Sequence, residues 1–334
     1  MRLFALSIAV ASVGSPALAQ PSGPFLVVES GRSFARLADA VAAIGDRTGT
    51  IEIAPGRYAD CAVQEAGQIA FVAKVPGSAV FDGGICEGKA TLVLRGRGAR
   101  VQGLRFMHEV VPDGNGAGIR LERANLSVVD SQFIDAQSGI LSADDPSGVI
   151  TVDHSTFAGL GKDPTGNGAH SLYIGKYSAL KVTNSRFERG TGGHYVKSRA
   201  PRAEIVDNSF DDSGGRDTNY MIDLSNGATG RITGNTFLNG LGKENHSVMI
   251  AVAAEGRVNS SAGLTIEHNR AALAPGYPWT TTFVGNWSRD PLVVRDNQLA
   301  AGLTNQRSLA ERETPHRLRL AASALKAKLR AWFP

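Results

Sequence analysis

The chain has 334 residues, of which 42% are hydrophobic and 20% are charged, and its formal net charge is +4. The positive charge is concentrated near the C-terminus. Residues 307–334 carry seven Lys or Arg and two Glu, which leaves the rest of the chain at −1. The body of the protein is therefore not basic, and this excludes a general affinity for nucleic acid. Any attraction for an acidic substrate has to come from a local cluster of side chains.

The N-terminal segment has the pattern of a secretory signal. Arg2 precedes an apolar run at residues 3–13, and Ala-Leu-Ala at residues 17–19 fits a small-x-small cleavage site. We expect residues 1–19 to be a signal peptide and the mature protein to be periplasmic or secreted. No other apolar run approaches membrane-spanning length, so we expect no transmembrane segment in the mature chain.

Two Cys residues, Cys61 and Cys86, stand 25 residues apart. Export would permit a disulfide between them, and their separation of about one repeat would place them on neighbouring coils. The other interpretation is two reduced Cys in the core. No His or further Cys stands near either one at metal-ligand spacing, so we expect no zinc site.

A β-rich segment that ends in Phe recurs along the chain at intervals of 27, 24, 30, 23 and 27 residues, giving Phe106, Phe133, Phe157, Phe187, Phe210 and Phe237. Short alternating strands with this period and with Gly, Asn and Asp turns predict a solenoid. We therefore predict an all-β, right-handed, single-stranded parallel β-helix over residues 20–305. Val, Ile and Phe would point inward. The Asn residues near one turn would stack and bond to the backbone; they are Asn208, Asn235 and Asn297.

Both ends of such a solenoid need a cover, because an open coil exposes its core and its strand edges. Ser33–Ile44 is predicted to form an N-terminal capping helix with one apolar face. Residues 306–334 are predicted to form a basic amphipathic helix, whose first turn follows Thr314-Pro315. This C-terminal helix either caps the solenoid or makes a peripheral contact with anionic lipid or polymer.

Four side chains that can move protons or bind an anion fall within six residues: His194, Tyr195, Lys197 and Arg199. Each repeat also holds a second strand, and four of these align on the inward positions Ile174, Val196, Ile222 and Met249 or Ile250. Strand alternation then turns Lys197 outward beside Asp223. The same alignment places Tyr173 and Tyr195 in one outward column. It also places His170, His194 and His246 at the strand entrances.

These residue types suit chemistry on a uronic-acid polymer. To break a 4-linked uronate without water, an enzyme neutralises the C6 carboxylate, removes the C5 proton and protonates the departing O4. We assign Lys197 or His194 as the base and Tyr173 as the acid. Arg199 and Lys197 surround the carboxylate, and Asp223 orients Lys197. Replacing Lys197 with Ala is expected to abolish activity and leave the fold intact.

The chain resembles the pectate-lyase-like β-helix superfamily over residues 26–300. Within it, Val196-Lys197-Ser198 followed by Asn208–Phe210 and Asn235–Phe237 is similar to the chondroitinase-B and alginate-lyase type of polysaccharide lyase. The resemblance implies a catalytic Lys at Lys197. It also implies an Arg in the next coil, where this sequence has Asp223. Calcium is the one cofactor that the resemblance raises, with Asp211-Asp212 as the candidate ligands; we predict no other metal or cofactor.

We therefore predict an exported lyase or C5-epimerase that acts on an acidic polysaccharide, and we expect a monomer. The residues expected to bind substrate are Tyr195, His170, Asn219, Tyr220, His246 and Asn226. One alternative is a non-catalytic β-helix that binds or guides a secreted polysaccharide. Another is a polygalacturonase-type hydrolase, for which Asp211-Asp212 and Gly193-His194 would supply the pieces. The ion pair of Lys197 with Asp223 could equally be a surface salt bridge of small effect.

Overall fold

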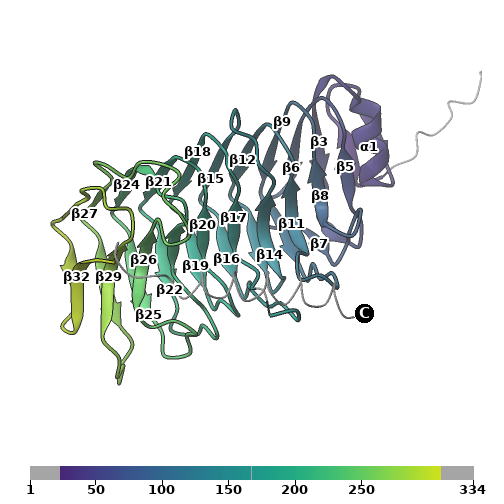
Figure 1. The fold of residues 1–334 in the computed structure, drawn as a ribbon. Coiled ribbons are helices and arrows are strands. Elements are labelled where there is room, and N and C mark those ends of the chain that lie inside the picture. The colour runs from purple at the N-terminus through teal and green to yellow at the C-terminus, as the bar shows by residue number, and fades with distance from the viewer. Residues whose placement is uncertain (1–22, 167, 310–334) are drawn as a thin grey trace, which may run out of the picture.

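The computed structural model describes residues 23–166 and 168–309. Within them the chain winds through stacked coils, and each full coil contributes one strand to each of three sheets, called sheets A, B and C here (Figure 1). Neighbouring strands come from successive coils and pair in parallel. The exceptions lie at the N-terminal edge, where β1 pairs antiparallel with both β2 and β3. This is the solenoid that the sequence predicts.

Sheet A has 12 strands. Its inward residues are aliphatic and buried; they include Ile51, Val101, Val128, Val152 and Ile205. In spatial order the strands are β2 (Arg32–Phe34), β1 (Phe25–Val27), β3 (Thr48–Ile53), β6 (Gln68–Ala73), β9 (Gly98–Gln102), β12 (Asn125–Val129), β15 (Val149–Asp153), β18 (Ala179–Thr183), β21 (Arg202–Val206), β24 (Thr229–Thr233), β27 (Thr265–Glu267) and β30 (Val293–Arg295).

Sheet B has ten strands and carries the recurring Phe residues. The rings from Phe106 to Phe237 stack inside the coil with centroids 4.8 to 5.0 Å apart, close to the strand spacing. The strands are β4 (Gly56–Tyr58), β7 (Ala79–Asp82), β10 (Leu104–Met107), β13 (Gln132–Ile134), β16 (Thr156–Ala158), β19 (Arg186–Glu188), β22 (Ser209–Asp211), β25 (Thr236–Asn239), β28 (Arg270–Leu273) and β31 (Gln298–Leu299).

Sheet C also has ten strands, and its outer face carries the candidate site. The strands are β5 (Ala62–Gln64), β8 (Ala90–Leu94), β11 (Ala117–Leu121), β14 (Ser138–Ser142), β17 (Leu172–Ile174), β20 (Val196–Ser198), β23 (Ile222–Leu224), β26 (Val248–Val252), β29 (Thr281–Asn286) and β32 (Leu303–Ser308).

A ladder of buried amides runs along the turn between sheets A and B. The Asn235 carboxamide accepts the backbone N–H of Asn208 at 2.9 Å, and Asn269 does the same for Asn235 at 3.0 Å. Asn297 continues the ladder by accepting from the Asn269 N–H at 3.0 Å. The predicted stacking of Asn208, Asn235 and Asn297 is confirmed, and Asn269 is a further member. Each amide satisfies backbone groups that the turn leaves without a strand partner.

At the N-terminal end lies helix α1 (Leu37–Ile44), whose buried residues are Leu37, Ala40, Val41 and Ile44. Asp60 accepts the Leu37 N–H at 2.8 Å and so satisfies one donor of the first turn. The helix begins four residues later than the sequence predicts. The reason is that Ser33 and Phe34 pair with β1 as part of β2, which commits their backbone groups to the sheet.

The structure joins Cys61 and Cys86 in a disulfide, as the sequence predicts. The bond links the segment before β5 to the segment before β8, so it ties the first coil of sheet C to the second. Strand β32 runs to Ser308, and the rest of the predicted C-terminal helix lies outside the described residues.

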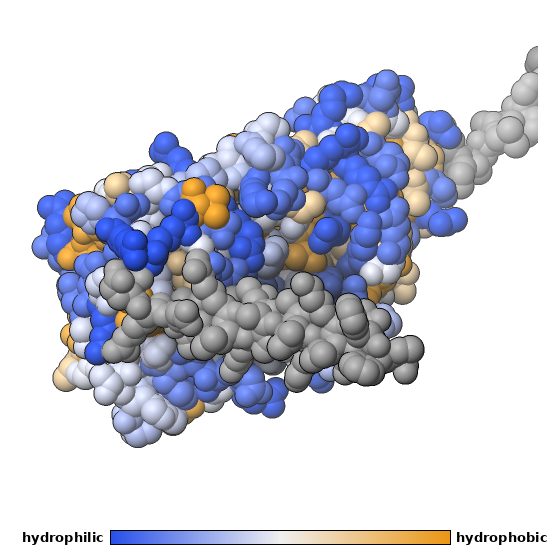
Figure 2. Space-filling view, viewed as in Figure 1, coloured by the Kyte–Doolittle hydropathy of each residue, from blue (hydrophilic) through white to orange (hydrophobic). Residues whose placement is uncertain are grey.

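The outer surface is mostly hydrophilic on the face drawn in Figure 2. Large apolar side chains that are exposed among the described residues are scattered along the solenoid: Val28, Val75, Val110, Leu241, Val258, Trp279 and Val293. No helix in the described ranges has the length and apolar character to cross a bilayer.

Candidate functional site

One row of outward side chains crosses all ten strands of sheet C. Strand register places in it, in order, Val63, Val93, Arg120, Leu141, Tyr173, Lys197, Asp223, Ala251, Gly285 and Arg307. The predicted pairing of Lys197 with Asp223 is confirmed. Tyr173, however, pairs with Lys197 rather than sharing a column with Tyr195, because Leu172 rather than Ile174 is the partner of Val196.

Lys197 is buried between two carboxylates, with only 5% of its side chain exposed. Its Nζ donates to Asp223 Oδ2 at 3.0 Å and to Glu255 Oε1 at 2.5 Å. Burial alone would lower the pKa of Lys197, but the attraction of Asp223 and Glu255 outweighs it and raises the pKa. Lys197 therefore carries its proton at neutral pH in this arrangement, and its assignment as the base stays a prediction.

Arg199 lies beside Lys197 and links three partners. Its Nε donates to the Tyr173 hydroxyl at 3.0 Å, one terminal nitrogen donates to Asn226 Oδ1 at 3.1 Å, and the other to Glu255 Oε2 at 2.6 Å. Burial opposes the charge, yet the bonds to Tyr173 and Glu255 raise the pKa of Arg199. Since Arg199 Nε occupies a lone pair of the Tyr173 oxygen, the Tyr173 hydroxyl proton is directed elsewhere. The Arg199 side chain is 22% exposed, so Arg199 is the more accessible cation of the pair.

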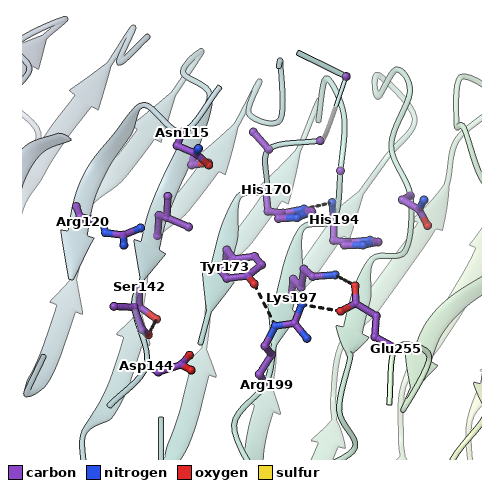
Figure 3. Close-up of a pocket in the computed structure, with 18 of the residues that line it drawn as sticks. Asn115, Arg120, Ser142, Asp144, His170, Tyr173, His194, Lys197, Arg199 and Glu255 are labelled. Atoms are coloured by element: carbon purple, nitrogen blue, oxygen red, sulfur yellow. Dashed lines mark hydrogen bonds and ion pairs between the residues drawn. The ribbon is translucent and has the colours of Figure 1, made fainter. Parts of the chain in front are cut away.

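Glu255 contacts both cations and is not among the residues predicted from the sequence. It stands three residues beyond β26, and its two oxygens bridge Lys197 and Arg199, as Figure 3 shows. Its side chain is 9% exposed. Buried cations such as Lys197 and Arg199 need a carboxylate partner. That requirement is the signal in the sequence that could have indicated a further acidic residue near them. Glu255 lies outside the strand pattern, in the segment that follows Val252.

His170 and His194 stack with Tyr220 in a ladder on successive coils. The ring centroids are 4.9 Å apart for His170 and His194, and 5.3 Å apart for His194 and Tyr220. Nδ1 of His170 accepts the backbone N–H of His194 at 2.9 Å, and Nδ1 of His194 accepts that of Tyr220 at 3.0 Å. A neutral imidazole that accepts at Nδ1 carries its proton on Nε2.

This geometry argues against His194 as the base, because its Nδ1 is occupied and its Nε2 holds the proton. That Nε2 faces Asp223 Oδ2 at 3.5 Å. Burial also lowers the pKa of His170 well below its ordinary value. The ladder depends on Gly193, whose backbone has φ +58° and approaches Ala169 so closely that a Cβ would lie 1.8 Å from its carbonyl oxygen.

The prediction that His246 shares the position of His170 and His194 is wrong. Ile222 pairs with Ile250, so the fourth member of the series would be Val248, two residues after His246. His246 instead stacks on Trp279 with centroids 3.5 Å apart, and its Nδ1 lies 3.1 Å from the Tyr277 hydroxyl.

The prediction that Tyr195 faces a substrate is also wrong, because its ring is 2% exposed and packs against Phe187 and Phe210 in the core. Its hydroxyl donates to Asp212 Oδ1 at 2.6 Å. Strand β20 begins only at Val196, so the alternation that would turn Tyr195 outward does not reach it. Met221, which the same alignment would turn outward, is also buried in the core, one residue ahead of β23.

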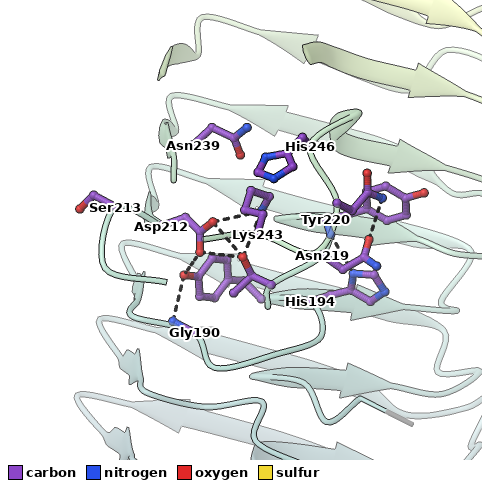
Figure 4. A network of polar contacts seen from close by, with 12 residues as sticks. Gly190, His194, Asp212, Ser213, Asn219, Tyr220, Asn239, Lys243 and His246 are labelled. Atoms are coloured by element: carbon purple, nitrogen blue, oxygen red, sulfur yellow. Dashed lines mark hydrogen bonds and ion pairs between the residues drawn. The ribbon is translucent and has the colours of Figure 1, made fainter. Parts of the chain in front are cut away.

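Asp212 is not available as a calcium ligand or as a hydrolase carboxylate. It is fully buried and accepts from Lys243 Nζ at 3.1 Å and from Thr218 at 2.9 Å, besides Tyr195 (Figure 4). Its neighbour Asp211 bonds to Ser213 within its own turn. The residues at this turn therefore do not fit a bound Ca²⁺, and they do not fit the polygalacturonase-type interpretation.

A groove of about 690 Å³ runs over these strands (Figure 3). It brings together Lys197, Arg199, His194, His170, Tyr173 and Asn219 of the predicted residues. Asn219 Oδ1 accepts from Asn245 Nδ2 at 3.0 Å. Asp223, Tyr220 and Asn226 stand behind this layer and contact it. The groove also contains residues that the sequence did not single out: Asn115, Arg120, Ser138, Ser142, Asp144 and Glu255.

Residues 117–298 match the family described as the right handed beta helix region. The chain belongs to this family. The match and the coil architecture confirm the resemblance to pectate-lyase-like right-handed parallel β-helices. No curated protein matches the chain.

Two solved structures are similar to this right-handed β-helix protein. A pectin methylesterase from Aspergillus niger is 13% identical with a TM-score of 0.49, and the alignment covers 86% of this chain and 90% of that one. A PL6 family alginate lyase is 14% identical with a TM-score of 0.48. In the second case the alignment covers 78% of this chain and 38% of the lyase.

Proposed function

We propose that this right-handed β-helix protein is an exported carbohydrate-active protein, and that it acts on a uronate-containing polysaccharide as a lyase or a C5-epimerase. The observation that carries the proposal is the convergence of Arg199, Lys197 and the Tyr173 hydroxyl in one open groove. A groove that follows the axis of a solenoid suits an extended polymer. Cations inside it suit a carboxylate on each sugar.

In this proposal Arg199 contacts the C6 carboxylate, and Lys197 behind it stabilises the charge that develops when C5 loses its proton. Tyr173 moves the proton. Its hydroxyl first releases its proton to solvent. The oxygen then takes the C5 proton and passes it to the departing O4, while the C4–O4 bond breaks and a C4=C5 double bond forms. An epimerase would instead need a water molecule on the opposite face of the sugar to protonate C5 there, while Tyr173 releases the abstracted proton to solvent and the glycosidic bond stays intact.

The roles assigned to Lys197 and His194 therefore change from base to support. Asp223 and Glu255 hold the Lys197 ammonium in place, and Asp223 also accepts from the Ser225 hydroxyl at 2.7 Å. With Lys197 and His194 in supporting roles, we assign proton transfer to Tyr173, whose hydroxyl faces the groove.

The test is incubation with alginate, pectate and glucuronan. Ultraviolet absorbance detects an unsaturated uronate, and NMR detects epimerisation. Replacing Tyr173 with Phe should abolish turnover and leave binding intact, because only the transferring oxygen is removed. The matched control is Tyr58→Phe, whose hydroxyl donates to the Ala54 carbonyl in the first coils, far along the chain from the groove. A Tyr173→Phe protein with full turnover would overturn the mechanism.

The second candidate is a non-catalytic protein that binds or guides a secreted polysaccharide. The observation that favours it is the compensation of charge in the groove: Glu255 already pairs with both Lys197 and Arg199, and the His170 and His194 rings accept backbone N–H groups. Binding to one of the three polymers, with neither product formed by the wild-type protein, would support this candidate over the first.

We also propose the finer assignments that the sequence suggests. Residues 1–19 are a signal peptide, and the β-helix domain, with α1 as its N-terminal cap, extends from residue 20 past the expected boundary at 305, because β32 runs to Ser308. The C-terminal helix is proposed for the residues after that strand. The disulfide supports export, because such bonds persist in oxidising compartments. N-terminal sequencing of the exported protein tests the first assignment. Truncation before Thr314 tests whether the last segment contributes a surface contact, and sedimentation tests the expected monomer.

A further inference from the structure

Arg120 lies in the same outward row as Tyr173 and Lys197, at the other end of the groove (Figure 3). Register leads from Arg120 on β11 through Leu141 on β14 and Tyr173 on β17 to Lys197 on β20. Strands of a sheet stand about 4.8 Å apart, so Arg120 is roughly 14 Å from Lys197 along the solenoid axis. The row therefore carries cations at two separated positions.

The charge of Arg120 has little compensation among the described residues. Its ionic contact is Glu122 at a distance of 4.0 Å. Glu122 is already engaged by Arg95 at 2.6 Å and by Lys89 at 2.8 Å. Arg95 itself contacts two further carboxylates, Glu65 and Glu87. Arg120 thus differs from Arg95, whose guanidinium contacts the carboxylates of Glu65, Glu87 and Glu122.

The Nε atom of Arg120 is buried and has no hydrogen-bond partner. A buried N–H without an acceptor costs free energy, so such a group calls for an explanation beyond packing. The side chain is 26% exposed and lines the groove, where an external acceptor can reach the guanidinium. Nearby lining residues are neutral and polar, namely Asn115, Ser138 and Ser142.

One acidic residue, Asp144, lines the same end of the groove. Its carboxylate accepts the Lys176 backbone N–H at 2.8 Å and pairs with Lys176 Nζ at 3.1 Å. The charge of Asp144 is therefore directed to Lys176 rather than to Arg120.

We propose that Arg120 is a second carboxylate-binding position of the groove, which binds an extended polyuronate along the solenoid axis with one carboxylate at Arg199 and a more distant one at Arg120. This inference rests on the proposed function and adds to it a substrate class: a polymer with repeated carboxylates, long enough to span three strand spacings. A single uronate or a disaccharide reaches one position only.

The experiment measures binding of oligouronates prepared from alginate and from pectate, from disaccharide to octasaccharide. Wild-type affinity should rise once the oligomer spans both positions. Arg120→Met should abolish that rise, a loss on the order of tenfold for the longest oligomers, since one charge-assisted pair is removed. Affinity for the disaccharide should stay the same. The Arg120→Met protein should melt at or above the wild-type temperature, because the buried unpaired donor is gone.

The matched control is Arg105→Met. Arg105 lies on β10 in the same coil but in sheet B, where its Nε donates to Gln132 at 2.9 Å. It should bind every oligomer as the wild type does. An Arg120→Met protein that keeps the full gain of affinity with length overturns the role of Arg120 and leaves the proposed function in place. A wild-type protein that binds no oligouronate of any length overturns the proposed function itself.

Discussion

Lys197 shows how burial changes the expectation for a single residue. Its ammonium neutralises Asp223 and Glu255, which are themselves almost fully buried. Removal of one member of a buried ion pair leaves an uncompensated charge and costs about 3–5 kcal/mol. Lys197→Ala should therefore lower the free energy of unfolding by that amount, contrary to the expectation from sequence that the fold would be unaffected.

Chemical denaturation of Lys197→Ala measures this cost. The matched comparison is the double variant Lys197→Ala with Asp223→Asn, which removes one of the two charges left behind and should recover part of the stability. Equal stability of wild type and Lys197→Ala would show that water or a rearranged Glu255 compensates the carboxylates.

Glu109 predicts a pH dependence of stability. Burial raises the pKa of Glu109 to about 7, above its ordinary value of 4.5. The Thr91 hydroxyl lies 2.8 Å from the Gly84 carbonyl oxygen and 3.1 Å from Glu109 Oε1. The Thr91 hydroxyl carries a single proton. When it donates that proton to the Gly84 carbonyl oxygen, its own oxygen can accept a hydrogen bond from a protonated Glu109.

Between pH 4.5 and 7, Glu109 is therefore protonated in the folded state and ionised in the unfolded state. The free energy of unfolding falls as pH rises through this range. Above it the loss is about 3 kcal/mol. Glu109→Gln should remove the loss, so its melting temperature should exceed that of the wild type at pH 8 and equal it near pH 4. Parallel melting curves of the two proteins across this range would contradict the assignment.

Which site residues could be predicted depends on whether strand rules apply to them. Lys197 and Asp223 were placed correctly because Val196 and Ile222 have to point inward, which fixes the outward neighbours on β20 and β23. The outward prediction for Tyr195 was wrong because Tyr195 precedes β20, and side chains alternate between the two faces only within a strand. Glu255 was missed because a loop brings it back over the sheet, and a repeat pattern contains no information on that path.

At the scale of elements, the Asn ladder is the feature with the clearest energetic role. The Asn235 Nδ2 group donates to the carbonyls of Ile205 and Thr233 and to Asn269 Oδ1, while its Oδ1 accepts from Asn208. Asn235→Ala leaves several of these buried groups without partners, each at a cost of about 1–3 kcal/mol. The expected result is a clear loss of stability by thermal melting.

The control for the ladder is Asn297→Ala at its last described position. Asn297 is half-buried, so water can replace part of what its amide supplies, and the loss should be smaller than for Asn235. Equal losses at the two positions would mean that the ladder acts through side-chain stacking alone.

Helix α1 illustrates the limit of prediction for an element. The apolar spacing of Leu37, Val41 and Ile44 predicts a helix correctly, since it follows the helical period. The same spacing extended the helix back to Ser33. Pairing of Ser33 and Phe34 with β1 is a long-range contact, so no local pattern could reveal it.

For the whole molecule, the disulfide secures the end of the array next to α1. In the chain-entropy account a loop closed over 25 residues contributes about 3.5 kcal/mol. Because coils contact mainly their neighbours, the loss should fall on the first coils. A Cys61→Ser, Cys86→Ser protein should melt at a lower temperature, and hydrogen exchange should be faster at β5 and β8 than at β26. A uniform change along the solenoid would contradict local action.

The solenoid as a whole was predictable because its signal is repeated. Six Phe residues at similar intervals reinforce one another, and each fits inside a coil only if the neighbouring coils adopt the same shape. The candidate site occurs only once along the described coils, so no repeated sequence pattern marks its residues. This is the physical reason why the architecture followed from the sequence and the details of the site did not.

The outward row on sheet C has a consequence for how this protein could change. Arg120, Tyr173 and Lys197 each belong to a different coil. The distances between them along the solenoid axis are therefore whole multiples of one strand spacing. A point substitution cannot adjust such a gap, whereas duplication or loss of a coil, such as the one that contributes β14, changes it by a whole step. Under the proposed function, the length of polymer that bridges Arg120 and Arg199 would therefore change only in whole coils.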